Sequence, residues 1–205
     1  MTFSHSITDR YFEDYVEADV HRFGSIAVEA DEVIAFAKRF DPQAMHTDPE
    51  AAKHTIFGGL IASGWHTAGL MMRLYAEHYL TQVSSLASPG IDELRWLKPV
   101  RPGDVLSVRV TVLKAVPSKS KPDRGAVTSF VEVINQVGVV VMTLNRDSPD
   151  ASRTGLSIGV FSASQQDRSA VRMATVTSGS PDDGRGADLA IFASICGHGP
   201  WVMLN

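Results

Sequence analysis

Cysteine is almost absent from this chain of 205 residues, with Cys196 the only one. An internal disulfide framework is therefore impossible, and a zinc site built from the cysteines of one chain is not expected. The first residues, MTFSHSITDRYFEDY, also lack the uninterrupted apolar segment of a signal peptide. Both features predict a cytoplasmic protein.

The chain also lacks a cluster of basic residues, and its net charge is −4. A nucleic-acid partner is therefore not expected, because phosphate binding normally requires Lys and Arg gathered on one face. No GxGxxG, Walker or HExxH sequence is present, so neither a bound nucleotide nor a metal is indicated. The isolated histidines His54, His66 and His78 are interpreted as solvated or packed side chains.

With 44% hydrophobic and 20% charged residues, the chain suits one globular domain with an appendage. A central helix is predicted from about Leu60 to Leu80, and its apolar, helically spaced positions include Ile61, Trp65, Ala68 and Met72. The neighbouring stripe is apolar too, which predicts burial on all sides. Charged residues such as Glu77 argue against a membrane span, so no membrane partner is expected.

The remaining periodicity predicts an α+β protein. Helices are expected over 31–40, which ends before Pro42, and over 49–53, with Asp48 as N-cap and Pro49 at the first helical position. Strands are expected over 23–28, 91–97, 105–113, 128–134 and 139–144, the last two joined by a hairpin. Strands that follow one buried helix predict an antiparallel sheet. Polar, Gly-rich composition predicts that 148–205 is a flexible or loosely packed extension.

Candidate chemistry gathers between Asp41 and Gly64. Asp41 and His46 lie on a connecting turn, where a carboxylate and an imidazole could together orient a water and move its proton. The alternative is that Asp41 only caps a turn and His46 is a satisfied buried histidine. Gly64 lies near the start of the central helix, where free N–H groups and the positive end of the helix dipole can receive a carbonyl oxygen that gains charge.

Two segments resemble a known family. The run DPQAMHTD, which starts at Asp41, and the run FGGLIASG, which ends at Gly64, resemble the hydratase motif of the MaoC-like dehydratases and (R)-specific enoyl-CoA hydratases. The resemblance extends from about Arg10 to Leu144. It implies that 1–147 is a hot-dog domain, a long central helix wrapped by an antiparallel sheet, and that the protein is a homodimer.

The resemblance also implies a reaction. Asp41 and His46 would hold the water that adds across the 2,3 double bond of an enoyl-CoA thioester, and the N–H of Gly64 would bind the thioester carbonyl. Coenzyme A arrives as part of the substrate, and no metal or redox cofactor is implied. Other expected pocket residues are Phe57, Ile61, Ser63 and Trp65. The chain departs from the family where Gln43 and Ala44 replace the familiar Asn-Pro, and where Met72 replaces a helix serine.

Two alternatives remain open at the sequence level. A hot-dog thioesterase would hydrolyse the same thioester, but it needs a carboxylate on the central helix, and Glu77 lies several turns from the glycine-rich start. A non-catalytic acyl-CoA binding domain would bind the ligand without turnover.

Overall fold

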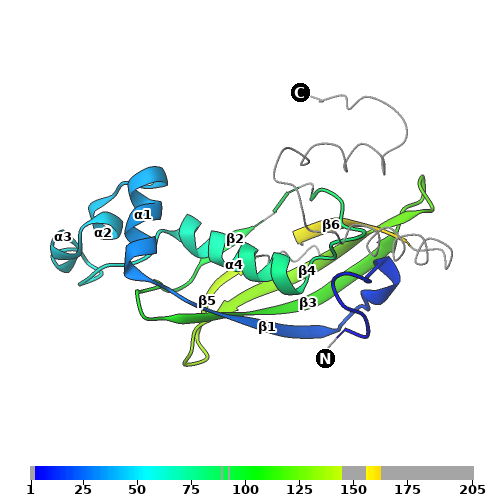
Figure 1. The fold of residues 1–205 in the computed structure, drawn as a ribbon, viewed down its shortest axis with the longest axis horizontal. Helices are drawn as coiled ribbons and strands as arrows, with labels where there is room; N and C mark the ends of the chain where they lie inside the picture. The colour runs from blue at the N-terminus through cyan, green and yellow to red at the C-terminus, as the bar shows by residue number, and fades with distance from the viewer. Residues whose placement is uncertain (1–2, 89, 92, 145–155, 163–205) are drawn as a thin grey trace, which may run out of the picture. The chain divides into compact units, whose positions relative to one another are not determined.

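The computed structural model describes residues 3–88, 90–91, 93–144 and 156–162 (Figure 1). One long helix, α4 (Gly64–His78), packs against one face of a six-stranded sheet. Every strand pair in this sheet is antiparallel. This is the α+β hot-dog arrangement that the sequence predicts. The other helical segments are η1 (Phe12–Asp14), α1 (Ala30–Phe40), α2 (Ala44–Thr47) and α3 (Pro49–Lys53).

The sheet has the strand order β1-β3-β4-β5-β2. These strands are β1 (Val20–Ala27), β2 (Leu94–Trp96), β3 (Val105–Pro117), β4 (Arg124–Ile134) and β5 (Val140–Leu144). All five predicted strands are present, with β3 and β4 longer and β2 shorter than the sequence indicates. The predicted hairpin joins β4 to β5, where the amide of Asn135 donates to the carbonyl of Val139. Gly138 supplies the positive φ of 82° that this turn requires.

A sixth strand, β6 (Leu156–Phe161), pairs with the part of β4 that β5 leaves open. It was not predicted, and it comes from the segment assigned to the loosely packed extension. The buried side chains of Ile158 and Val160 alternate in the two-residue period of a strand. The predicted boundary at 147 therefore leaves out one strand, while 148–155 and 163–205 lie outside the described residues.

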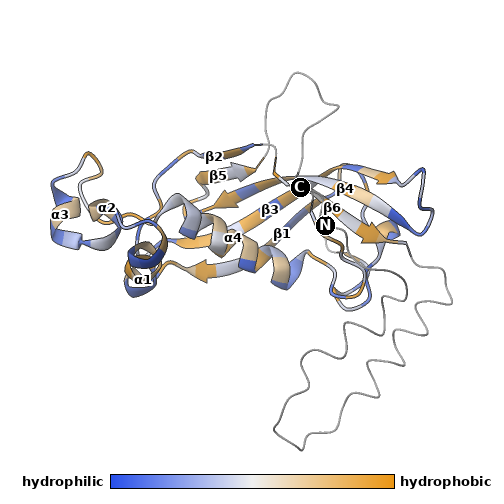
Figure 2. Cartoon of the chain, turned by 90° about the horizontal axis from the view of Figure 1, so that it is seen from above, coloured by the Kyte–Doolittle hydropathy of each residue, from blue (hydrophilic) through white to orange (hydrophobic). Residues whose placement is uncertain are grey.

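The core lies between α4 and the facing side of the sheet. Alternate residues of β3 and β4 point toward the helix, as the strand period requires, and Figure 2 shows apolar segments recurring along these two strands. Fully or nearly fully buried members are Leu70, Met71, Leu74, Tyr75, Leu106, Val108, Val110, Val112, Val127, Val131 and Val133. Each such aliphatic side chain contributes about 1.5–3 kcal/mol relative to exposure. This packing fixes α4 on the sheet.

The bounds of α4 differ from the prediction at both ends. The helix begins at Gly64 instead of Leu60, because the preceding backbone is engaged elsewhere: the amide of Ala62 donates to the carbonyl of Val100 at 2.8 Å. Ser63 is the N-cap, and its side chain accepts from the amide of Trp65. The start of the helix is thus defined by a side-chain cap and by a contact with a distant loop.

The prediction that α4 is buried on all sides is wrong for the described chain. Its buried face consists of His66, Thr67, Leu70, Met71, Leu74 and Tyr75. The opposite face carries Trp65 and Met72, which are 61% and 44% exposed, and the exposed small residues Gly69 and Ala76. In the described part of the chain, no helix has the length and apolar character needed to cross a bilayer.

Helices α1 and α3 form where the sequence predicts them. The Asp48 carboxylate accepts from the amides of Glu50 and Ala51 at 2.8 and 3.1 Å, which caps α3 as expected. Figure 1 shows α1, α2 and α3 gathered at the end of α4 where Gly64 lies. The short connections between them bring the α1–α2 turn to the beginning of the central helix.

Candidate active site

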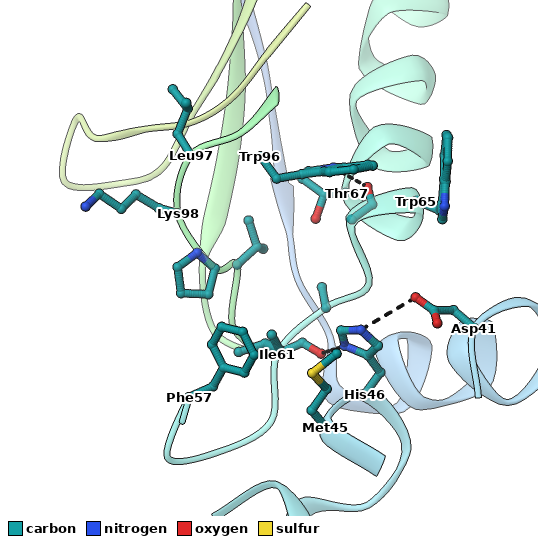
Figure 3. Close-up of a pocket in the computed structure, with 14 residues that line it drawn as sticks. Asp41, Met45, His46, Phe57, Ile61, Trp65, Thr67, Trp96, Leu97 and Lys98 are labelled. Atoms are coloured by element: carbon teal, nitrogen blue, oxygen red, sulfur yellow. Dashed lines mark hydrogen bonds and ion pairs between the residues drawn. The ribbon is translucent and has the colours of Figure 1, made fainter. Parts of the chain in front are cut away.

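A cavity of about 420 Å³ lies at the N-terminal end of α4 (Figure 3). It is bounded by the end of α1, by α2, by the first turn of α4 and by the segment that follows β2. Its lining residues are Asp41, Met45, His46, Phe57, Ile61, Ala62, Gly64, Trp65, Thr67, Trp96, Leu97, Lys98, Pro99 and Val100. Most of these side chains are apolar, and the titratable ones are Asp41, His46 and Lys98.

Asp41 and His46 face each other in this cavity, with Oδ2 and Nε2 separated by 3.5 Å. The Nδ1 atom of His46 lies 2.9 Å from the carbonyl oxygen of Ile61. A carbonyl can only accept, so Nδ1 must carry a proton and donate. A neutral His46 therefore presents the lone pair of Nε2 toward Asp41. The two groups form a pair of acceptors to which one water can donate both of its protons.

Two side chains donate hydrogen bonds to the Asp41 carboxylate. The side-chain amide of Gln43 donates to Oδ1 at 2.7 Å, and the hydroxyl of Ser63 donates to Oδ2 at 2.7 Å. The hydrogen bonds from Gln43 first and Ser63 second lower the pKa of Asp41, and burial opposes them with a smaller effect. Asp41 is therefore an ionised acceptor at neutral pH. Gln43, a departure from the family motif, still supplies an amide donor.

Gly64 is the first residue of α4, so its amide has no carbonyl partner one turn earlier in the helix. The indole of Trp96 lies against the same residue, and its Nε1 donates to the carbonyl of Gly64 at 2.9 Å. A Cβ at position 64 would lie 2.4 Å from Cε2 of that indole. Glycine is thus required by the close approach of Trp96, and it leaves the first helical amide beside the cavity.

The structure brings most of the predicted site residues together. Phe57, Ile61 and Trp65 line the cavity beside Asp41, His46 and Gly64. Ser63 does not line it: the residue is fully buried, and its hydroxyl is directed to Asp41 and to the amide of Trp65. Ser63 therefore contacts the carboxylate of Asp41 from behind the cavity wall.

Several lining residues were missed, and Trp96 is the most important. It lies in a predicted strand, but neither its spacing nor its neighbours indicate which element it contacts. Lys98, in the segment after β2, also lines the cavity. Arg101 lies outside the lining, and its guanidinium donates to the carbonyl of Phe57 at 2.5 Å and so fixes that loop.

The isolated histidines do not form a metal site in the described residues, where no group of three or more His, Cys, Asp or Glu side chains could hold a metal ion. His66 is buried and stacks on Phe36 with the ring centroids 4.9 Å apart. Its Nε2 lies 3.8 Å from a carboxylate oxygen of Glu32. Burial lowers the pKa of His66, while Glu32 opposes that shift.

Comparisons with known proteins agree with this fold. A family model described as a MaoC like domain matches residues 12–135. The chain is 32% identical over 129 residues to the uncharacterized protein YdeM of Bacillus subtilis, which covers 63% of this chain and 90% of that protein. It is 29% identical over 116 residues to the 3-hydroxybutyryl-CoA dehydratase of Methylorubrum extorquens, covering 54% of this chain and 69% of that enzyme.

Among solved structures, the MaoC-like dehydratase of Rhodospirillum rubrum is 41% identical to this chain and superposes with a TM-score of 0.66. The match covers 76% of this chain and 99% of that one. The family model spans more than half of the sequence, and the predicted resemblance is confirmed. The chain belongs to the MaoC-like dehydratase family.

Proposed function

We propose that this protein is a hydratase or dehydratase that adds water across the 2,3 double bond of an enoyl-CoA thioester, or removes it from the 3-hydroxyacyl-CoA. The observation that carries the proposal is the convergence of Asp41 and His46, 3.5 Å apart, on a cavity that also holds the first amide of α4. Family membership and the likeness to a 3-hydroxybutyryl-CoA dehydratase support the same reaction class.

In the hydration direction, a water bound between Asp41 and His46 attacks C3 of the substrate. The Nε2 atom of His46 accepts the proton that this water loses, because Nδ1 is already committed to the carbonyl of Ile61. General acid–base assistance of this kind contributes about 10²- to 10⁴-fold. The protonated imidazole can then return the proton to C2, so that OH is added at C3 and H at C2.

Attack at C3 moves negative charge onto the thioester oxygen. The amide of Gly64 and the positive end of the α4 dipole can stabilise that charge as it develops. Loss of one such donor typically lowers the rate by about 10²- to 10³-fold. The acid–base pair and the amide thus act at opposite ends of the reacting C3–C2–C1 unit.

The test uses crotonyl-CoA and follows the loss of absorbance of its conjugated double bond. We expect Asp41→Asn and His46→Gln to lower kcat by at least about 10²-fold with unchanged far-UV circular dichroism. The matched controls are Asp48→Asn, which keeps a good N-cap, and His54→Gln at an exposed position. Rates like that of the wild type in Asp41→Asn and His46→Gln would overturn the assignment.

The same crotonyl-CoA assay distinguishes the hydratase from the two alternatives, a thioesterase and a non-catalytic binding domain. A thioesterase would release free thiol without prior loss of the enoyl absorbance. Glu77, the carboxylate of the central helix considered for this activity, does not line the cavity; it accepts instead from Nε of Arg73 at 3.0 Å. Tight binding of crotonyl-CoA without turnover would instead indicate a binding domain.

Hydration causes no net oxidation or reduction of the substrate, so the reaction needs no redox cofactor. We also propose that the enzyme is cytoplasmic and works without a metal ion. Coenzyme A then enters and leaves only as part of the substrate. Activity that survives dialysis against a strong chelator is the expected result. Activity that disappears on chelation and returns with an added metal ion would contradict this part of the proposal.

We propose further that the protein is a homodimer. Helix α4 has an exposed apolar face, which is formed by Trp65, Gly69, Met72 and Ala76. An interface with a second copy of the chain would bury this face. Strand β2 is the last strand in the order of the sheet, and no strand of the described residues pairs with its outer edge. Such an edge favours pairing with another chain. Trp65 belongs both to this face and to the cavity lining, so a second copy placed there would also close the cavity wall.

Light scattering after size-exclusion chromatography tests the dimer. We expect a dimer for the wild type and a shift to monomer for Met72→Glu, because a carboxylate in an apolar interface must lose its hydration. Val137→Glu is the control, since Val137 is an exposed apolar residue on the β4–β5 hairpin. A monomeric wild type, or equal effects of both substitutions, contradicts the proposed interface.

A further inference from the structure

We propose that Ser63 is a positioning residue that fixes the Asp41 carboxylate to the N-terminus of α4, an inference that rests on the proposed function. Ser63 is fully buried. Its Oγ lies 2.7 Å from Oδ2 of Asp41 and 3.2 Å from the amide nitrogen of Trp65. One hydroxyl therefore joins the acid–base pair to the first turn of the helix that supplies the proposed oxyanion donor.

The direction of this hydrogen-bond chain follows from the groups involved. The amide of Trp65 can only donate, so the oxygen of Ser63 accepts from it. The single hydroxyl proton is then directed to Asp41, and the carboxylate accepts. This polarity suits an ionised Asp41 and leaves no proton on the carboxylate that would compete with the bound water.

The segment from Ile61 to Gly64 contacts both members of the acid–base pair and also contains the proposed oxyanion donor. The carbonyl of Ile61 holds His46, the hydroxyl of Ser63 holds Asp41, and the next residue, Gly64, lines the cavity. The carbonyl of Ser63 also accepts from the amide of Thr67 as part of the helix. A shift of this segment would therefore move the water-binding pair and the oxyanion donor together.

The charged and titratable groups around Asp41 come from four elements. His46 faces it from α2, and Lys98 reaches the cavity from the segment after β2. Lys38 and Arg39 are exposed on α1, and His66 on α4 lies toward Glu32. Removal of the Ser63 hydroxyl takes away a donor to the charged form of Asp41, so the pKa of that carboxyl is expected to rise.

The primary test is Ser63→Ala combined with Ser63→Gly. Both remove the hydroxyl, but glycine is much better tolerated than alanine as an N-cap, so the two variants separate the loss of the hydroxyl from the loss of the cap. We expect both variants to lower kcat by about 10- to 10²-fold, the loss that corresponds to a hydrogen bond with a charged group. KM should stay within about twofold, because Ser63 does not line the cavity. The acidic limb of the kcat–pH profile should move to higher pH.

Ser84→Ala is the matched control. Ser84 is also a buried serine, and its hydroxyl donates to the carbonyl of Arg10 at 2.8 Å, beyond the C-terminal end of α4. The substitution removes a buried hydrogen bond of the same kind and should leave the pH profile in place. Ser63→Thr, which retains the hydroxyl, should keep the acidic limb at its wild-type position.

A carbon-13 NMR titration of the Asp41 carboxyl, assigned with Asp41→Asn, separates this inference from the proposed function. A midpoint and pH profile that do not move in either Ser63→Ala or Ser63→Gly would overturn the positioning role. A change in KM alone would also overturn it and return Ser63 to the substrate-contact role. If the wild type has no hydratase activity, the proposed function fails, whereas an upward shift of the midpoint would still establish the Ser63–Asp41 link.

Discussion

Replacing Gly64 with alanine tests how closely the helix start and the Trp96 indole are packed. The new Cβ would lie 2.4 Å from Cε2 and 2.6 Å from Nε1 of Trp96. Carbon atoms in contact prefer separations of about 3.5–4.0 Å, so the ring or the helix start must move by about 1 Å. The ring is itself restrained by its hydrogen bond to the carbonyl of Gly64 and by an edge contact with Trp65, with centroids 5.4 Å apart.

The magnitude follows from three opposing contributions. Overpacking costs about 1–3 kcal/mol, and loss of the indole hydrogen bond costs about 0.5–1.5 kcal/mol. The better helix propensity of alanine returns at most about 1 kcal/mol. We therefore expect Gly64→Ala to lower the free energy of unfolding by about 0.5–3.5 kcal/mol. If the first amide of α4 shifts by about 1 Å as well, kcat should fall by about 10²-fold.

A double-mutant cycle with Trp96→Ala isolates this contact. Urea unfolding and crotonyl-CoA hydration would be measured for the wild type, both single variants and the double variant. Without the indole, the methyl group at position 64 has room, so the stability cost of Gly64→Ala should nearly vanish and leave a coupling free energy of at least about 1 kcal/mol. An equal cost of Gly64→Ala with and without Trp96 would refute the packing argument.

Three further outcomes follow from other contacts. Burial lowers the pKa of His66 below 6.5, so the folded state binds a proton less readily than the unfolded state. The free energy of unfolding should therefore be highest above about pH 6.5 and should fall as the pH decreases. Urea unfolding between about pH 8 and pH 5 should show this slope, and His66→Phe should reduce it. Arg101→Ala removes the hydrogen bond to the carbonyl of Phe57, and we expect KM to rise more than kcat falls in steady-state kinetics. Asp48→Ala should lower the unfolding free energy by about 0.5–2 kcal/mol while Asp48→Asn stays close to wild type, and equal melting temperatures for the two variants would contradict the capping role.

The sequence predicts the elements whose signals are local. Helix α3 is indicated by Asp48 and Pro49, and the structure confirms this cap. The start of α4 was misplaced because it depends on long-range contacts, such as the hydrogen bond from Ala62 to Val100, which no window of sequence contains. The exposed face of α4 was mistaken for core because hydrophobic periodicity records an apolar face without recording what covers it.

The same distinction applies to the site. Asp41, His46 and Gly64 could be found together because one short span contains them all. Trp96 could not be found, because its contact with Gly64 depends on the register that pairs it with Met142 of β5. A register is set by the whole sheet, and a slip of one residue would turn this indole to the opposite face. Strand β6 was missed for another reason, since its short alternation lies within a stretch of polar, Gly-rich composition.

On the proposed pathway, the N-terminus of α4 can stabilise two negative charges, one on Asp41 and one on the thioester oxygen. Before reaction, the charge is on Asp41, which is held at the N-terminus of α4 through Ser63. As water attacks C3, His46 gains a proton next to that carboxylate, and the thioester oxygen gains negative charge near the amide of Gly64. Positive charge thus develops beside Asp41 while negative charge develops at the same positive helix end. The donors are in place before either charge moves, so little reorganisation is needed during the reaction, which is the condition under which fixed dipoles lower a barrier most effectively.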